Sequence, residues 1–172
     1  MRTCGECTLC CELLPVKELG KGAGTRCSHQ SFKGCRIYAS RPRSCRLWSC
    51  GWLTGGDCAD LRRPDRSHYV VDPMPDFITI EDGDTGEQTK LPVIQIWCDP
   101  KYPNAHRDPA LRKLLEEHSH PALVRYSERN AIVLIPPVFN KDGGWREVES
   151  GMAEKQHSAE EIAKFMEENQ SV

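Results

Sequence analysis

Residues 4–11 read CGECTLCC, so that Cys4, Cys7, Cys10 and Cys11 fall within eight positions. The first three repeat the C-x2-C-x2-C spacing with which bacterial ferredoxins wrap iron–sulfur clusters. A ferredoxin continues with x3-C-P, whereas here the fourth cysteine follows at once. Adjacent cysteines point in different directions in most backbone conformations, so Cys10 and Cys11 would serve two metal centres, or one would bridge a polynuclear site. Either arrangement requires more than four ligands in total.

Four more cysteines follow at wider spacing: Cys27, Cys35, Cys45 and Cys50. Four plus four thiols would fill two tetrahedral sites, or one cluster and a second site. His29, two residues after Cys27, is a candidate imidazole ligand in place of one sulfur. Cys58 and Cys98 stand apart from this set. Because Cys98 ends the apolar run VIQIWC, we expect it to be a small buried thiol.

The composition indicates how these thiols are used. Ten cysteines among 172 residues are about 6% of the chain, below the roughly 8–10% typical of secreted disulfide scaffolds. The sequence has no apolar run near the ~18 residues that span a bilayer, and its first fifteen residues lack a signal-peptide core. We therefore expect a cytoplasmic protein without a membrane partner. In a reducing compartment, metal ligation is favoured over disulfide or redox chemistry and over inert thiols.

Charge is distributed unevenly along the chain. The net charge is −2, but residues 1–66 carry 12 Lys and Arg against 6 Asp and Glu. This basic part also holds nine of the ten cysteines. Thiolates around a metal leave net negative charge, which nearby arginines would offset; a solvated basic face is the plainer explanation. Few aromatic residues interleave with the arginines, which disfavours nucleic acid as a partner.

The two parts of the chain differ in composition and in apolar periodicity. Residues 1–58 are rich in Cys, Gly and Arg and have no sustained apolar periodicity, so a bound metal is the expected source of order. We expect residues 1–60 to form a cysteine-rich metal-binding region and residues 61–172 an α+β region, packed as a single compact domain.

Residues 61–172 show strand and helix patterns in turn. Alternating or continuous apolar runs predict strands at 67–72, 76–81 and 90–97, and two more around a polar turn at 128–130. A helix is predicted after Asp108, with Pro109 at its first position, and another after a capping box from Ser158 to Glu161. The expected fold is α+β: a cysteine-rich, metal-organised N-terminal segment packed on a small antiparallel sheet with two or more helices.

The cysteine spacing and the segment GCRIYASRPRSCR (residues 34–46) together resemble a known family. CGECTLCC, a later cysteine, C-x-I-Y and R-P-x-x-C-R follow in the order found in the YkgJ-type cysteine-cluster family, described as a putative zinc- or iron-chelating domain. The resemblance covers about residues 4–53 and implies chelation by Cys4, Cys7, Cys10, Cys11, Cys27, Cys35 and Cys45. Cys50 extends the set. A flagellin lysine methylase is among the few members with an assigned activity, and nothing in this chain brings a methyl-donor site.

The residues around Cys45 suggest how a metal would be enclosed. Pro42 can open a short helix that turns Cys45 inward. Aromatic and apolar side chains nearby would cover the metal from solvent: Tyr38, Leu47, Trp48 and Trp52. Arg41 and Arg46 are candidate hydrogen-bond donors to the sulfurs, although pairing with surface carboxylates is an alternative.

Three functions follow as hypotheses. In the first, a zinc or iron centre, including an iron–sulfur cluster, performs redox or Lewis-acid chemistry on a small-molecule or protein partner. In the second, zinc is structural and the acidic α+β half recognises a protein. In the third, the Cys10–Cys11 pair does thiol redox chemistry. Sulfur-rich sites suit both metals, and the sequence leaves enzymatic activity open.

Overall fold

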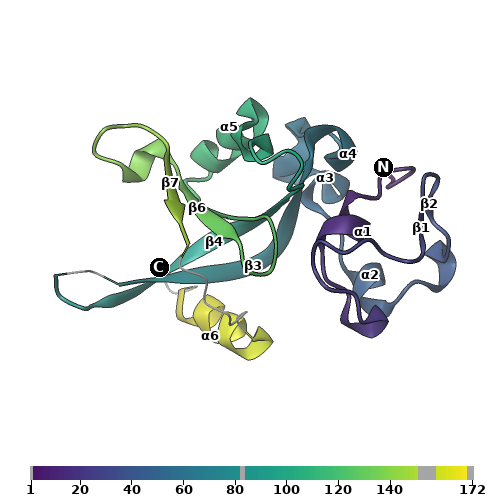
Figure 1. Ribbon diagram of the computed structural model, residues 1–172. Coiled ribbons are helices and arrows are strands. Elements are labelled where there is room, and N and C mark those ends of the chain that lie inside the picture. The colour runs from purple at the N-terminus through teal and green to yellow at the C-terminus, as the bar shows by residue number, and fades with distance from the viewer. Residues whose placement is uncertain (1, 82–83, 151–157, 170–172) are drawn as a thin grey trace.

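The computed structural model describes residues 2–81, 84–150 and 158–169 and has the predicted α+β architecture. Residues 2–60, hereafter the cysteine-rich lobe, lie to one side of a five-stranded sheet (Figure 1). The elements up to residue 67 are α1 (Leu9–Leu13), η1 (Lys17–Leu19), β1 (Gln30–Ser31), β2 (Gly34–Cys35), η2 (Tyr38–Ser40), α2 (Arg43–Leu47), α3 (Gly51–Thr54), η3 (Gly56–Asp60) and α4 (Pro64–Ser67). They are short, as expected of a segment without apolar periodicity.

The remaining elements build the sheet and its helices. They are β3 (Tyr69–Glu81), β4 (Gln88–Cys98), η4 (Ala105–Arg107), α5 (Pro109–Glu117), β5 (Ala122–Arg125), β6 (Ala131–Ile135), η5 (Pro137–Phe139), β7 (Arg146–Glu149) and α6 (Ala159–Asn169). The strand order is β3-β4-β5-β6-β7. Neighbours pair antiparallel as predicted, except that β4 and β5 are parallel because the chain crosses over through α5 between them. In the part of the chain described, no helix is long and apolar enough to cross a membrane.

The prediction of two strands at 67–72 and 76–81 is wrong in one respect, because the structure joins them into β3. The strand continues through Pro73 and Pro75. It lies at the edge of the sheet, where a residue without an N–H costs no ladder hydrogen bond on the open side. Its pairing with β4 shifts register at this point, since Asp72 lies opposite Gln95 but Asp76 lies opposite Val93. Such a bulge bends a strand and re-aims its side chains.

The β3–β4 connection is the predicted turn, and part of it, Asp82 and Gly83, lies outside the described residues. The strands on either side pair as a hairpin that ends at Glu81 and Gln88. The strands predicted around 128–130 are confirmed as β5 and β6.

One face of the sheet carries the main apolar core. Side chains alternate between the two faces of a strand, and on this face Tyr69, Ile96 and Val124 are at most 2% exposed. They pack against α5 through Leu111 and Leu115. The N-terminus of α5 is as predicted: Pro109 is its first residue, and the Asp108 carboxylate accepts a hydrogen bond from the Ala110 amide at 2.9 Å.

The opposite face meets the cysteine-rich lobe. Val70 and Trp97 pack with Leu9, Leu13 and Cys50 of the lobe. Helix α6 packs farther along β3, where the ring of Phe165 lies 4.8 Å from that of Phe77. In Figure 1, α5 lies above the sheet and α6 lies below the β3–β4 hairpin.

The capping box predicted for α6 is confirmed. The Glu161 amide donates to the Ser158 hydroxyl at 3.1 Å, and the Ser158 amide donates to the Glu161 carboxylate at 2.7 Å.

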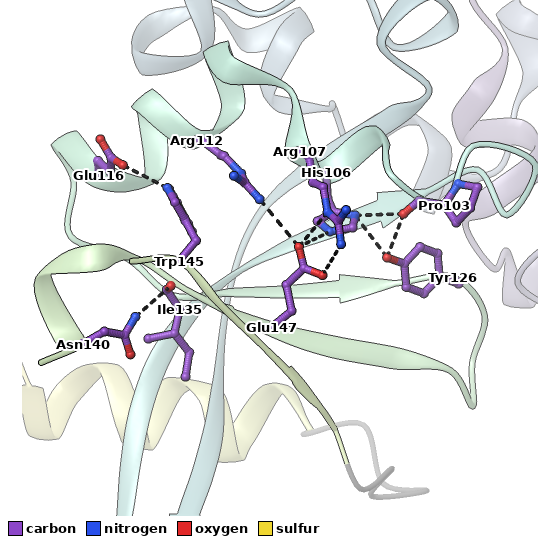
Figure 2. Close-up of polar contacts among 10 residues, drawn as sticks. All are labelled: Pro103, His106, Arg107, Arg112, Glu116, Tyr126, Ile135, Asn140, Trp145 and Glu147. Atoms are coloured by element: carbon purple, nitrogen blue, oxygen red, sulfur yellow. Dashed lines mark hydrogen bonds and ion pairs between the residues drawn. The ribbon is translucent and has the colours of Figure 1, made fainter. Parts of the chain in front are cut away.

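The sequence analysis missed the edge strand β7, which is fixed by a polar network around Glu147 (Figure 2). The Glu147 carboxylate accepts two hydrogen bonds from Arg107, at 2.9 and 2.8 Å, and lies 3.0 Å from His106 Nε2 and 3.6 Å from Arg112. His106 is 2% exposed, and its Nδ1 lies 2.9 Å from the Pro103 carbonyl oxygen. These charged contacts join β7 to η4 and α5. The four residues of β7 are exposed and add little apolar burial, so the strand depends on the charged contacts for its position.

Candidate metal centre

A cavity of about 400 Å³ lies where the cysteine-rich lobe meets the sheet. Its lining includes His29 and all eight cysteines of the predicted ligand set: Cys4, Cys7, Cys10, Cys11, Cys27, Cys35, Cys45 and Cys50. Cys58 and Cys98 do not line it. Both belong to the main core instead, and Cys98 is 1% exposed, as predicted. The structure thus gathers thiols from separate segments of the lobe around one space.

Short-range backbone contacts place the first four cysteines. The Cys7 amide donates to the Cys4 carbonyl at 2.9 Å and closes a turn before α1. Cys10 and Cys11 follow on α1 itself. The Cys27 amide then donates to the Cys11 carbonyl at 2.9 Å, which holds the next cysteine beside the helix.

The β1–β2 hairpin brings Cys35 to the cavity, and Gly34 permits its close approach to the N-terminal segment. Gly34 has φ +111°, and a Cβ at this position would lie 2.9 Å from the carbonyl oxygen of Gly5. Any side chain would therefore clash with backbone and strain the dihedral as well. The Gln30 side chain fixes the other end of the hairpin by donating to Glu12 on α1 at 2.9 Å.

Cys45 lies on α2, which starts directly after Pro42 as predicted. The carboxylate of Glu18 caps this helix from another part of the lobe, since it accepts hydrogen bonds from the Ser44 amide at 2.9 Å and the Ser44 hydroxyl at 2.7 Å. Cys50 precedes α3 and is buried.

Cys10 and Cys11 differ in acidity although they are adjacent. The Cys10 thiol donates a hydrogen bond to Cys11, and this contact, together with the charge of Lys21, lowers the pKa of Cys11 to about 7 against the effect of burial. The same hydrogen bond, followed by burial and the charges of neighbouring cysteines, raises the pKa of Cys10 well above its usual value. Cys11 is thus the more readily ionised sulfur of the pair.

The thiols act on one another electrostatically across the cavity. Burial, and then the charges of Cys4 and Cys7, raise the pKa of Cys50 to about 11. Cys50 and Cys7 likewise act on Cys10. Burial also raises the pKa of Cys45, and Cys11 and Cys27 add to the effect. Burial raises the pKa of Cys4 as well, and the charge of Cys11 adds to it. The thiols therefore form one electrostatically connected set.

Lys21 is a buried cation that the sequence analysis missed. It is 8% exposed, and its ammonium donates to the backbone carbonyls of Leu14, Glu12 and Gly22. Burial lowers its pKa, while the charges of nearby cysteines, first Cys27 and then Cys11, raise it. A positive charge is thus held beside the cysteines, nearest in effect to Cys27 and Cys11.

The residues predicted to enclose a metal are only partly in place. Tyr38, Trp48 and Trp52 line the cavity, but Leu47 does not and is 73% exposed. The Arg41 guanidinium lies 3.9 Å from the centre of the Tyr38 ring and donates to the Tyr38 carbonyl at 3.5 Å.

Neither Arg41 nor Arg46 donates a hydrogen bond to a sulfur among the residues described, so that prediction is not confirmed. Arg41 does lower the pKa of Cys4, although burial has the larger and opposite effect. Arg46 is exposed and lies outside the cavity lining.

Across the described ranges, no three His, Cys, Asp or Glu side chains already converge as a metal-holding group. Burial keeps most of the thiols protonated, and protonated thiols have no reason to point at a common centre. The donor set still fits a soft metal in number and kind, because zinc and iron both take thiolate ligands in fours. Closing such a shell would require loss of the thiol protons and rotation of the side chains.

The floor of the cavity comes from the sheet, and the sequence analysis missed it entirely. Asp72, Gln95, Trp97 and Arg125 line the cavity from three adjacent strands. They are distant in sequence, so only strand register brings them together.

No protein-family model matches the chain, and neither a curated protein nor a solved structure matches it significantly. The resemblance of residues 4–53 to the YkgJ-type cysteine-cluster family stays a prediction.

Proposed function

We propose that this protein binds zinc or iron through the eight cysteines that line the cavity. The observation that supports the proposal is their common location: four segments of the lobe, far apart in sequence, each contribute thiols to one space. Chance placement of free thiols would scatter them over the lobe. Cys58, only eight residues beyond Cys50, lies outside the cavity, so proximity in sequence alone does not account for the grouping.

Eight thiols suffice for two tetrahedral metal centres, and the adjacent Cys10 and Cys11 would then serve one centre each. Each set of four carries roughly −2 when bound to zinc or to an oxidised four-iron cluster. Lys21 and Arg41 lie close enough to the cysteines to offset part of this charge. Bound zinc would supply a structural or Lewis-acid centre, and bound iron would supply a redox centre.

The test is anaerobic purification of the full chain with elemental analysis and a visible spectrum. About two zinc ions per chain without visible colour would indicate two tetrathiolate zinc sites. Bound iron with labile sulfide and broad visible absorption would indicate iron–sulfur chemistry. A chain that retains neither metal, and takes up neither under reducing conditions, would refute the proposal.

Single substitutions identify the ligands. Cys7→Ser and Cys45→Ser should each lower the bound metal, because serine is a poor ligand for soft metals. Cys58→Ser is the matched control, since this thiol lies in the same lobe but outside the cavity. Equal metal content in all three variants would mean that the cavity cysteines are not ligands.

A structural zinc module that binds a protein partner is the second candidate. Two large apolar side chains of the lobe favour it, because Phe32 is 81% exposed and Leu47 is 73% exposed. A zinc shell closed by four thiolates, with no open position, would support this function over a catalytic one.

A further inference from the structure

The cavity has a second chemical region on the sheet, away from the cysteines. In parallel and antiparallel pairs alike, residues opposite one another lie on the same face. Gln95 lies opposite Asp72, and Trp97 lies opposite Arg125. These four side chains consequently share the sheet face that lines the cavity. Charged groups in the middle of a sheet face, with apolar clusters on both sides, need a specific reason to be there.

A chain of hydrogen bonds fixes the position of Arg125. Its Nε donates to Gln95 Oε1 at 3.0 Å, and Gln95 Nε2 donates to Asp76 Oδ2 at 2.6 Å. The Arg125 guanidinium also lies 5.6 Å from the centre of the Trp97 ring. Arg125 is only 8% exposed. Its orientation is therefore set by the protein before any ligand arrives.

Several polar atoms of this region are left without protein partners. Within residues 2–81, 84–150 and 158–169, the indole N–H of Trp97 is buried without a hydrogen-bond partner, and Arg125 donates to the protein through Nε alone. Asp72 uses only Oδ1, which accepts from Trp48 Nε1 at 2.9 Å and from the Met74 amide at 3.0 Å. Since an unused buried donor costs about 1–3 kcal/mol, the Trp97 N–H indicates a ligand with an acceptor group. Asp72 Oδ2 can accept from a donor group of the same ligand.

The bulge in β3 supports this interpretation. It lies between Asp72 and Asp76, so the two carboxylates flank the Gln95 and Arg125 pair. Bulges are enriched next to binding and active sites, where they aim side chains that a regular strand could not.

Charge and size narrow the class of ligand. Asp72 and Arg125 offer one negative and one positive charge to a ligand, so a lone carboxylate would leave the charge of Asp72 without a counterpart. A lone ammonium ion would face Arg125 unpaired. A zwitterion satisfies both signs and leaves the net charge unchanged. The cavity volume of about 400 Å³ is that of a small-molecule site, and its aromatic walls, Trp48 and Trp52, suit an apolar side chain.

We propose that this polar floor binds the head group of a free apolar α-amino acid, with the carboxylate on Arg125 and Trp97 and the ammonium group on Asp72. The side chain of the ligand then extends along the tryptophans towards the cysteines. This site goes beyond metal binding, and its occupancy can be measured whether or not a metal is present.

The test is a thermal-shift screen of the full chain with individual L-amino acids at millimolar concentration, followed by calorimetry. For L-leucine, 4-methylpentanoate lacks only the ammonium group and 3-methylbutylamine lacks only the carboxylate. We expect at least one apolar amino acid to bind, and its two matched analogues to bind roughly tenfold more weakly or worse, because each loses a charged hydrogen bond. If no amino acid binds, or if either analogue binds as tightly as the amino acid, the proposal is refuted.

Two conservative variants locate the site. Asp72→Asn keeps the Oδ1 acceptor for Trp48 but loses the charge, and Trp97→Phe keeps a ring but loses the N–H. Each should weaken amino-acid binding by roughly tenfold, whereas Arg129→Gln on the exposed β5–β6 turn should not. Unchanged affinity in both variants would overturn the assignment. Metal content measured in the same samples separates this result from failure of the proposed metal binding.

Discussion

Replacing Gly34 with alanine tests how the hairpin that carries Cys35 is held against the N-terminal segment. Two costs are expected. A backbone at φ +111° is strained for any residue with a side chain, which costs about 1–3 kcal/mol. In addition, the new Cβ would lie 2.9 Å from the Gly5 carbonyl oxygen, so that one of the two backbone segments must move.

We expect Gly34→Ala to lower the free energy of unfolding by about 2–3 kcal/mol, with the backbone strain and the displacement taken together. In a chain of this size, 1 kcal/mol shifts the melting temperature by roughly 2–4 °C, so a decrease of about 4–12 °C should appear by calorimetry. Metal binding should weaken as well, because the displaced hairpin takes Cys35 with it.

Gly55→Ala is the matched control. Gly55 also has positive φ, +77°, but nothing lies within 4 Å of where its Cβ would be. The Gly55→Ala variant has the dihedral strain but no close contact for the new Cβ. Its free energy of unfolding should therefore fall less than that of Gly34→Ala, and its metal content should be unchanged. If the two variants lose the same stability and both retain metal, the Gly34–Gly5 approach does not hold the site together.

Three further outcomes are expected. Glu147→Gln should remove stability that depends on pH. Arg107 first, and then His106, lower the pKa of Glu147 from 4.5 to about 2. The contribution of this carboxylate to the free energy of unfolding is therefore complete above pH 4.5 and is lost as the pH falls to about 2. Urea unfolding should thus show a difference from the unaltered protein at neutral pH that disappears in acid, and a constant difference would contradict this role. Leu111→Ala should cost about 2–5 kcal/mol in the same assay, since this side chain is 0% exposed in the main core; a loss below about 1 kcal/mol would mean that α5 is loosely packed. Chelation of the metal should raise amide hydrogen exchange in the cysteine-rich lobe far more than in β5 and β6, because metal binding contributes folding free energy where core burial is small; equal changes in both parts would contradict a metal-organised lobe.

Local signals in the sequence predicted local structure well. Asp108 before Pro109 fixed the start of α5, and the Ser158 and Glu161 pair fixed the start of α6, because each signal is satisfied by residues at most three positions away. The strands predicted at 67–72 and 76–81 are one strand in the structure. A strand can continue through prolines where it lies at an edge, and that position depends on neighbours that a local pattern does not reveal.

In the candidate site, too, some residues could be predicted from local patterns and others could not. The eight cysteines could be selected from their spacing and number, and the structure gathers them around one cavity. The polar floor could not be selected, because Arg125 meets Gln95 only through a parallel pairing made across the crossover helix α5. Lys21 was missed for a related reason: its burial follows from the fold of the loop after α1, in a segment that gives no periodic signal.

The two prolines of β3 also bear on how the protein behaves when concentrated. An open sheet edge offers unpaired N–H and C=O groups on which a strand of another molecule can assemble, and such edges promote aggregation. Pro73 and Pro75 have no N–H to offer, and the bulge around them twists this edge away from a regular ladder. The feature that aims Asp72 into the cavity thus also protects the sheet from growing by addition of a second chain.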